Sequence, residues 1–268
     1  MCSCKEVQLH LRQDFTTVLD NKAMKKKIER QLIKLLSLRT LGFLGFINGA
    51  TKPRKKSYSQ YGEDLVILNF FEKIGQKTDG FYVDIGAYHP TLISNTHLLH
   101  KNNWTGVCVD LCEEKLKWFR YRRGAKVKTI CAGVTASESG REISVFKHKK
   151  LLSEIDTLSK EIAQKNKLHH GYDFIEERIL TLNINGLFIR INREIDLLNI
   201  DIEGLDQLVL GAIDFKRFRP KVILFEDNEN FGGSTDTVNM LVESGYRHLF
   251  SSGGSVAYYS TDLLANNY

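Results

Sequence analysis

The feature that most constrains this chain is a series of short apolar runs, each ending in an acidic residue or a glycine. Four such runs occupy residues 80–86, 106–111, 195–201 and 221–226. Short apolar runs bounded by turn residues are typical of strands that are buried on both faces of a parallel sheet. Segments with helical apolar spacing separate the runs. Strands that alternate with helices predict an α/β domain with a doubly wound parallel sheet.

The remaining elements extend this pattern toward the C-terminus. We expect further strands at residues 126–134 and 141–146, and helices at residues 65–71, 94–99, 113–122, 205–213 and 235–244. Two short final strands, 246–250 and 255–260, predict a C-terminal antiparallel hairpin. Residues 148–178 are charged and helix-prone, so we interpret them as an insertion.

The first 57 residues differ from the rest of the chain in charge. They contain 13 Lys and Arg against 4 Asp and Glu, so their net charge of 13 − 4 = +9 exceeds the whole chain's net charge of +6. Apolar residues near helical spacing predict a basic helix over residues 17–46, followed by a polar linker at residues 49–56. We therefore divide the chain into a basic helical N-terminal arm with its linker, residues 1–57, and a catalytic domain, residues 58–268. Such a helix can contact an anionic membrane surface, a partner or a second copy of the chain; a loosely packed, solvated helix is equally compatible.

Cysteine usage and hydropathy bear on the compartment. The chain has five cysteines, an odd number, and three of them fall in or near predicted core strands. This usage indicates reduced thiols. The sequence shows no signal-peptide pattern, and the apolar stretch at residues 32–49 is too short and too polar to span a bilayer. We expect a cytoplasmic protein, peripheral to a membrane if the arm binds one.

The first apolar run leads into a glycine turn with acidic residues near it. Asp84 and Gly86 end that run, and Asp110 ends the next one. In such sheets ligands bind at the carboxyl ends of the strands, where an acidic side chain can accept hydrogen bonds from ribose hydroxyls. The turn lacks the G-x-G-x-x-G motif, so it is poorly suited to binding the pyrophosphate of a dinucleotide. Asp84, Gly86 and Asp110 together favour an adenosine ligand without a pyrophosphate. Two alternatives stay open: Asp110 could only cap the following helix, and Gly86 could form an ordinary turn.

Several motifs, in the same order along the chain, resemble the FkbM-type methyltransferases. They are Ser59-Gln60-x-Gly62-Glu63-Asp64, Phe81-Tyr82-Val83-Asp84-Ile85-Gly86-Ala87-x-His89-Pro90, Ser94-Asn95-Thr96, Asn103-Trp104-x-Gly106-x-x-x-Asp110 and Asp201-Ile202-Glu203-Gly204. The resemblance covers roughly residues 58–259. It implies a seven-stranded Rossmann-like sheet and methyl transfer from S-adenosylmethionine, typically to hydroxyl groups of sugars or natural products.

The same resemblance indicates which residues bind the cofactor. Together with the strand-end argument it gives Gln60, Glu63, Asp84, Gly86, Ala87, Asn95, Asp110 and Leu111. The family often carries Glu where this chain has Asp110. Residues 148–178 match no part of the family pattern, so acceptor recognition by that segment is not readable.

A second acidic cluster follows two later strands. Asp201 and Glu203 come after one strand, while Glu226, Asp227 and Asn228 end or follow the next. If these strands are neighbours, Asp201 lies within several ångströms of Asp227 and Asn228, and such oxygen ligands suit Mg²⁺ or Mn²⁺. The set resembles the metal-binding pattern of catechol-type O-methyltransferases, in which the cation would lower the pKa of a substrate hydroxyl.

A mechanism without metal is equally open. The general base would then be one of four residues: Asp201, Glu203, Glu226 or His89. A neutral imidazole at His89, in the turn after the first strand, could accept a proton from a hydroxyl. A structural histidine packed against Pro90 is the alternative for that position.

The sequence also narrows the partners. We expect a small-molecule or glycan acceptor, although the sequence specifies neither its identity nor the position methylated. A nucleotide-sugar oxidoreductase is disfavoured by the missing pyrophosphate loop, and an inactive cofactor-binding scaffold by the intact acidic and glycine positions. No nucleic-acid partner is expected, because the domain body is not basic and lacks an Asn/Asp-Pro-Pro-Tyr motif.

Overall fold

The computed structural model describes residues 57–75, 79–137, 139–149, 156–202, 204–226 and 235–265. The chain divides into two compact units, Met1–Arg54 and Lys55–Tyr268, and all described residues belong to the second. The expected arm helix at residues 17–46 and the linker at 49–56 lie outside the described residues.

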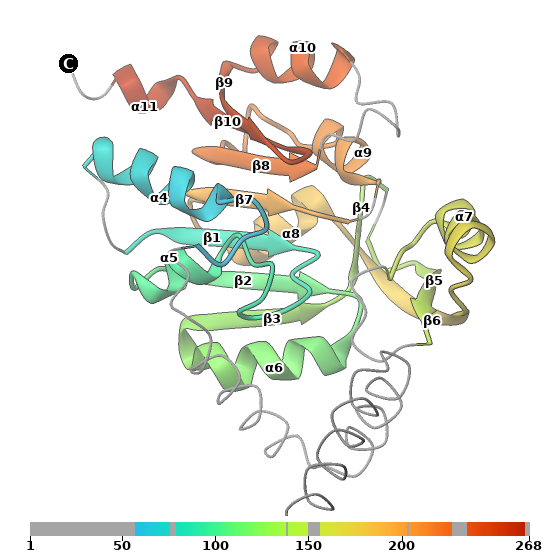
Figure 1. Cartoon of the computed structure of the whole chain (residues 1–268). Helices are drawn as coiled ribbons and strands as arrows, with labels where there is room; N and C mark the ends of the chain where they lie inside the picture. Colours follow the sequence, from blue (N-terminus) through green and yellow to red (C-terminus); the bar gives the residue numbers. More distant parts are fainter. Residues whose placement is uncertain are drawn as a thin grey trace, which may run out of the picture. The chain divides into compact units, whose positions relative to one another are not determined.

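A seven-stranded sheet forms the centre of the second unit (Figure 1). Its strands run in the order β3-β2-β1-β7-β8-β10-β9. They are β1 (Phe81–Ile85), β2 (Thr105–Asp110), β3 (Val127–Cys131), β7 (Leu197–Ile200), β8 (Val222–Glu226), β9 (Tyr246–Ser252) and β10 (Ser255–Ser260). The first five strands of that order are parallel, and β10 pairs antiparallel with both β8 and β9. The predicted doubly wound, Rossmann-like sheet with its C-terminal hairpin is confirmed.

Helices pack on both faces of this sheet. One face is covered by α4 (Glu63–Lys73), α5 (His97–Lys101) and α6 (Glu113–Arg123), and the other by α8 (Ile184–Ile191), α9 (Asp206–Gly211) and α10 (Thr235–Glu243). A 3-10 turn, η1 (Gly124–Lys126), precedes β3, and a short helix, α11 (Asp262–Ala265), follows β10. The result is a three-layer arrangement with the sheet in the middle.

The side chains of β1 show why its sequence is apolar without interruption. Phe81, Val83 and Ile85 belong to the hydrophobic cluster on the α8–α10 face, whereas Tyr82 belongs to the cluster on the α4–α6 face. All five residues of the strand are buried. Asp84 alternates with the first set, so its carboxylate lies on the α4–α6 side, where a polar network surrounds it.

A second, three-stranded sheet is built from β4 (Gly133–Thr135), β6 (Phe174–Asn183) and β5 (Glu142–His148). The single strand expected at residues 126–134 is therefore two strands, because the chain leaves the main sheet after Cys131 and β4 pairs with β6. The expected helical insertion contains α7 (Lys160–His170) and also the first half of β6. The sequence did not predict β6, because half of its residues are exposed and they give no apolar alternation.

Two further findings concern membrane-spanning helices and the cysteine thiols. Within the described ranges, no helix is long and apolar enough to cross a membrane. Cys108, Cys112 and Cys131 are free thiols, and the first two are buried. Burial raises the pKa of the Cys108 thiol well above its usual value, which keeps that thiol protonated and unreactive.

Candidate functional site

The carboxyl ends of β1, β2, β7 and β8 lie at one edge of the main sheet. From β1 the chain continues outward to β2 and β3, then returns to place β7 on the other side of β1, so the strand order reverses between β1 and β7. Open α/β sheets bind their ligands beyond the strand ends at such a reversal. Two hollows open at this edge, and Asp201, which directly follows β7, lines both of them.

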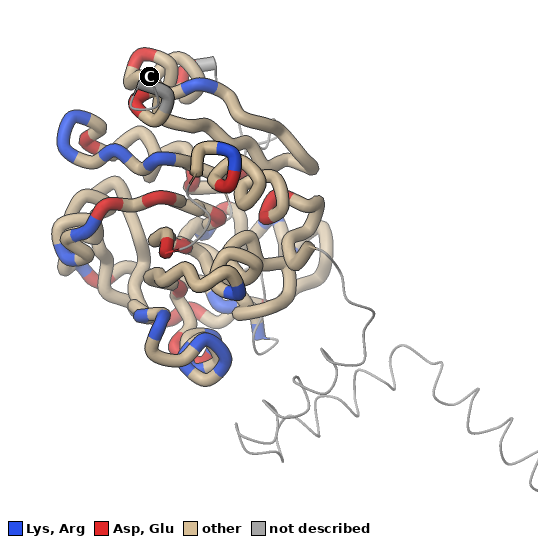
Figure 2. Tube along the Cα trace, turned by 90° about the vertical axis from the view of Figure 1, so that its left-hand side faces the viewer, with Lys and Arg blue, Asp and Glu red and all other residues tan. Residues whose placement is uncertain are grey.

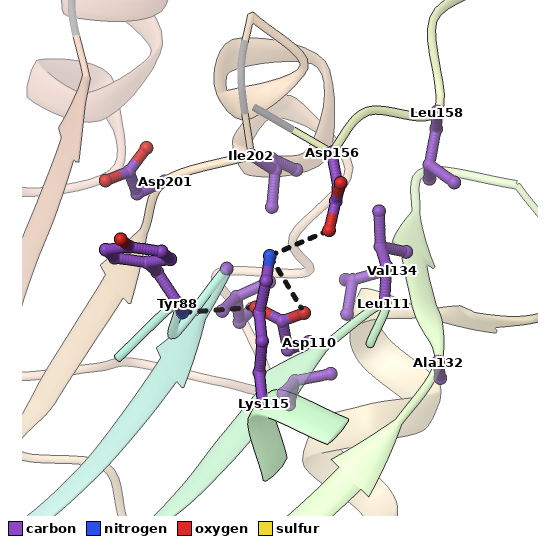
Figure 3. A pocket seen from close by; sticks show the side chains of 13 residues that line it. Tyr88, Asp110, Leu111, Lys115, Ala132, Val134, Asp156, Leu158, Asp201 and Ile202 are labelled. Carbon is purple, nitrogen blue, oxygen red and sulfur yellow. Dashed lines mark hydrogen bonds and ion pairs between the residues drawn. The ribbon is translucent and has the colours of Figure 1, made fainter. Parts of the chain in front are cut away.

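The first hollow lies beyond the ends of β1 and β2 (Figure 3). Three of the predicted cofactor-binding residues line it: Gly86, Asp110 and Leu111. The carboxylate of Asp110 is buried and accepts hydrogen bonds from the backbone N–H groups of Cys112 at 2.8 Å and Tyr88 at 3.1 Å. These bonds hold the Asp110 carboxylate in one orientation at the wall of the hollow.

A buried lysine stands beside Asp110. The Nζ of Lys115 lies 2.9 Å from Asp156 and 3.6 Å from Asp110, and it faces the Tyr88 ring at 5.6 Å. Figure 3 shows Lys115 between the two carboxylates. Burial alone would lower the pKa of Lys115, but the carboxylates of Asp110 and Asp156 outweigh that effect and raise it. The lysine is therefore charged, and it links the segment between β5 and α7 to the end of β2.

Gly86 brings the first turn against the strand end that carries Asp201. Its φ is 81°, and a Cβ added there would lie 1.7 Å from the carbonyl oxygen of Asp201. The backbone N–H groups of Gly86 and Ala87 both donate to the carbonyl of Val109, at 2.9 and 3.1 Å. Only glycine fits this position, because it needs both a left-handed backbone and the space that a side chain would occupy.

Asp84 lies beneath the two hollows and lines neither of them. Its carboxylate accepts hydrogen bonds from the Thr96 hydroxyl at 2.5 Å and the Asn199 amide at 2.9 Å. Asn199 in turn accepts a hydrogen bond from Asn95 at 3.1 Å. Burial raises the pKa of Asp84, while nearby Arg123 and these hydrogen bonds act in the opposite direction. Asp84 thus supports Asn95 and Asn199, which both line the second hollow.

Arg123, at the end of α6, fixes the loop between β1 and α5 from below. Its buried guanidinium donates to the carbonyl of Pro90 at 2.8 Å, the hydroxyl of Ser94 at 2.8 Å and the hydroxyl of Thr96 at 2.9 Å. It also donates to the Tyr82 hydroxyl at 2.9 Å. The loop that presents Asn95 is therefore anchored by a single buried cation.

The second hollow lies over the ends of β7 and β8. Five of the predicted site residues line it: Gln60, Glu63, Asn95, Asp201 and Glu226. The lining also includes Asn199 and Ser255 and, among the residues that the structure describes, no lysine or arginine. The hollow thus offers several hydrogen-bonding groups and a negative charge.

The loop before α4 presents Gln60 and Glu63 to this hollow. Asp64 holds that loop by accepting hydrogen bonds from the hydroxyl of Ser59 at 2.9 Å and the backbone N–H of Tyr58 at 2.7 Å. The carboxylate of Glu63 accepts a hydrogen bond from the backbone N–H of Tyr61 at 2.9 Å. These contacts explain why acidic residues occupy both positions at the start of the helix.

The other predicted residues lie apart from the hollows or cannot be placed. Ala87 is buried, and His89 accepts hydrogen bonds at Nδ1 from the backbone N–H groups of Thr91 at 3.1 Å and Leu92 at 3.0 Å. Burial, with Arg122 and Arg123 nearby, lowers the pKa of His89 to about 4, and neither hollow includes it in its lining. Glu203, Asp227 and Asn228 lie outside the described residues.

Sequence reasoning missed several residues of the first hollow, among them Tyr88, Lys115, Asp156 and Leu158. Tyr88 lies in the predicted turn and Lys115 starts the helix after Asp110, so proximity to the motifs was a usable signal for both. No signal marked Asp156 and Leu158, because they come from the segment that resembled nothing.

Comparison with known proteins identifies one family and several distantly similar structures. Residues 84–248 match the family model described as the methyltransferase FkbM domain. The structural comparison includes a TehB-like SAM-dependent methyltransferase from Corynebacterium glutamicum (TM-score 0.40, 11% identity, 81% of this chain and 94% of that one). It also includes a precorrin-6y C5,15-methyltransferase from Geobacter metallireducens (TM-score 0.38, 13% identity, 78% and 94%). TM-scores at this level support no conclusion about function. No curated protein matches the chain.

Proposed function

The chain belongs to the FkbM family of S-adenosylmethionine-dependent methyltransferases, and we propose that it methylates a hydroxyl group of a sugar or glycan. The observation that carries the proposal is the position of Asp201 on the common wall of two hollows. A donor in one hollow and an acceptor in the other would meet beside this carboxylate.

The first hollow fits the cofactor. Asp110 offers carboxylate oxygens for two ribose hydroxyls, and Val109, Val134 and Leu158 supply apolar walls for an adenine ring. Gly86 lines the hollow, and its lack of a side chain lets the turn after β1 pack directly against the Asp201 carbonyl.

The second hollow fits a hydroxyl-rich acceptor. Amide groups of Gln60, Asn95 and Asn199 and the carboxylates of Glu63 and Glu226 can bind several hydroxyls in fixed directions. The carboxylates among its described lining residues disfavour phosphorylated or carboxylated acceptors, which they would repel.

When bound, S-adenosylmethionine supplies an electrophilic methyl group attached to a sulfonium sulfur, and the rest of the molecule leaves as a neutral thioether. The task of the protein is to orient the acceptor hydroxyl and to remove its proton. We assign proton acceptance to a carboxylate oxygen of Asp201 and orientation of the acceptor to Glu226. Asn199 and Asn95, held through Asp84, would fix neighbouring hydroxyls.

A divalent cation shared by Asp201, Asp227 and Asn228 remains part of the proposal as the alternative route to an activated hydroxyl. Asp227 and Asn228 cannot be placed, and the described part of the chain contains no group of three or more His, Cys, Asp or Glu arranged to hold a metal. Activity assays with EDTA, followed by Mg²⁺ or Mn²⁺, distinguish the two routes. Full activity in chelated buffer would leave Asp201 or another of the predicted bases as the proton acceptor.

The decisive experiment incubates the protein with isotope-labelled S-adenosylmethionine and a panel of neutral and acidic sugars, and locates the label by mass spectrometry. We expect O-methylation of a neutral sugar, loss of turnover in Asp201→Asn, and retained cofactor binding in that variant. The exposed Asp173→Asn is the matched control. Label on nitrogen or carbon, or tight NAD binding without a response to S-adenosylmethionine, would overturn the proposal.

A further inference from the structure

A third hollow, of about 630 Å³, lies at the opposite edge of the main sheet, where β7 and β8 begin. Three segments line it: residues 192–195 before β7, residues 216–221 before β8, and residues 260–263 after β10. Figure 2 views the unit from the edge where the parallel strands begin, and shows Lys and Arg on several segments there. Because parallel strands end at the other edge, the hollow is separate from the proposed methyl-transfer site.

Cations outnumber carboxylates in the lining of this hollow, five to two. Two of the five are already paired. Arg219 donates to Asp262 at 2.7 Å and to the carbonyl of Ser244 at 3.0 Å, while Lys221 bonds to Asp196 at 2.6 Å. These pairs form a fixed wall and leave the other three cations to determine the charge inside the hollow.

The remaining cations are Arg193, Lys216 and Arg217, which are all exposed. Within the part of the chain that the structure describes, none of them forms an ion pair with a carboxylate. The Arg193 guanidinium lies 4.5 Å from the centre of the Phe81 ring and donates to the Thr105 hydroxyl at 3.2 Å. The Arg217 guanidinium lies 5.0 Å from the Phe218 ring.

Each of these two guanidiniums lies near an aromatic ring, a contact that is favourable for a cation. The fork of N–H donors on a guanidinium matches the oxygens of a phosphate group. The only lining carboxylate not yet assigned a partner is Glu194, so the hollow keeps an excess of positive charge.

We propose that this hollow binds an anion that carries more than one negative charge on its phosphate oxygens. Three cations without carboxylate partners need more than one negative charge for compensation, and the volume suits a small molecule or a headgroup. The same chemistry is present in a free oligophosphate and in the phosphate headgroup of an anionic lipid. The inference does not depend on the acceptor or on the methyl-transfer chemistry.

The test uses the full-length protein, inorganic pyrophosphate and tripolyphosphate as calorimetric probes, and two variants of equal charge. One variant is Arg193→Gln/Lys216→Gln/Arg217→Gln. The control removes three exposed cations elsewhere, Lys128→Gln/Lys160→Gln/Arg178→Gln. We expect the hollow variant to bind tripolyphosphate at least about tenfold more weakly, through loss of charge-assisted bonds, and the control to bind like the parent. If the triple hollow variant fails to fold, Lys216→Gln/Arg217→Gln serves in its place.

Vesicles of phosphatidylcholine, with and without phosphatidic acid, distinguish the two sources of phosphate. Sedimentation with phosphatidic acid vesicles that the hollow variant loses and the control retains would identify a lipid headgroup. Calorimetric binding without such a difference would identify a soluble anion. Equal weakening of probe binding in both variants, or no binding of either probe or of the anionic vesicles by the parent, would overturn the proposal.

Discussion

Replacing Gly86 with alanine tests whether the first turn positions Asp201 between the two hollows. The left-handed backbone at φ 81° costs a residue with a side chain about 1–2 kcal/mol. The added Cβ would lie 1.7 Å from the Asp201 carbonyl oxygen, although such contacts are essentially never shorter than 3.0 Å. The backbone at Asp201 must therefore retreat by more than about 1 Å, and a displacement of this size beside the reacting atoms lowers turnover about 10²-fold.

Gly140→Ala is the matched control, because Gly140 has φ 82° and nothing within 4 Å of the added Cβ. It carries the same backbone strain without the contact at Asp201. Urea unfolding should show a loss of about 1–2 kcal/mol in the control and a larger loss in Gly86→Ala. Calorimetry should show weaker S-adenosylmethionine binding in Gly86→Ala alone. Equal stability losses in the two variants, with cofactor affinity and turnover unchanged, would refute the reasoning.

Three further predictions concern single residues and the arm. Asp110→Ala should weaken S-adenosylmethionine binding by about 1–3 kcal/mol in calorimetry, because charge-assisted bonds to the ribose are lost. The control Asp173→Ala should bind the cofactor like the parent. Parent-like affinity in Asp110→Ala would leave Asp110 only a structural role. Burial, partly offset by backbone hydrogen bonds and reinforced by Glu226, raises the pKa of Asp206 from 3.8 to about 7. The native protein then holds a proton that the unfolded chain has released, so the free energy of unfolding should fall as pH rises from about 4 to about 7, by up to about 4 kcal/mol. Urea titrations should show that Asp206→Asn lacks this fall and that the exposed Asp236→Asn keeps it; an unchanged pH profile in Asp206→Asn would contradict the assignment. Removal of residues 1–54 should leave a folded unit that still binds S-adenosylmethionine by calorimetry, and aggregation of the truncated protein would show that the arm covers part of the core.

The main sheet was predictable because its central strands are buried on both faces. β1, β2, β7 and β8 are short apolar runs with an acidic residue within one position of their ends, and that pattern locates both the strands and the edge where ligands bind. The small sheet was not predictable, since half of β6 is exposed and its pairing with β4 and β5 depends on contacts between distant segments.

The sequence predicted which acidic residues gather near the site, but it could not show which of them line a hollow and which are buried beneath it. Asp84 is the fourth residue of β1, so its side chain points into the layer of α4–α6, whereas Asp110 ends β2 and reaches the first hollow. That difference depends on where each strand stops, which motif spacing does not reveal. The pairing of Lys115 with Asp156 was out of reach for a similar reason, because 41 residues separate the partners and the second lies in the unmatched segment.

The small sheet of β4, β5 and β6 is weakly buried, and Ala163 is the buried residue of its helix α7. Local opening of such a unit costs less free energy than opening the main sheet. Asp156 and Leu158, just before α7, belong to the wall of the first hollow, so a ligand that contacts them there favours the state in which the small sheet and α7 are folded. At about a hundredfold excess over its Kd, the ligand raises the free energy of opening by about 2.7 kcal/mol. Protease sensitivity of the segment around α7 would then act as a reporter of cofactor occupancy, readable without any knowledge of the acceptor.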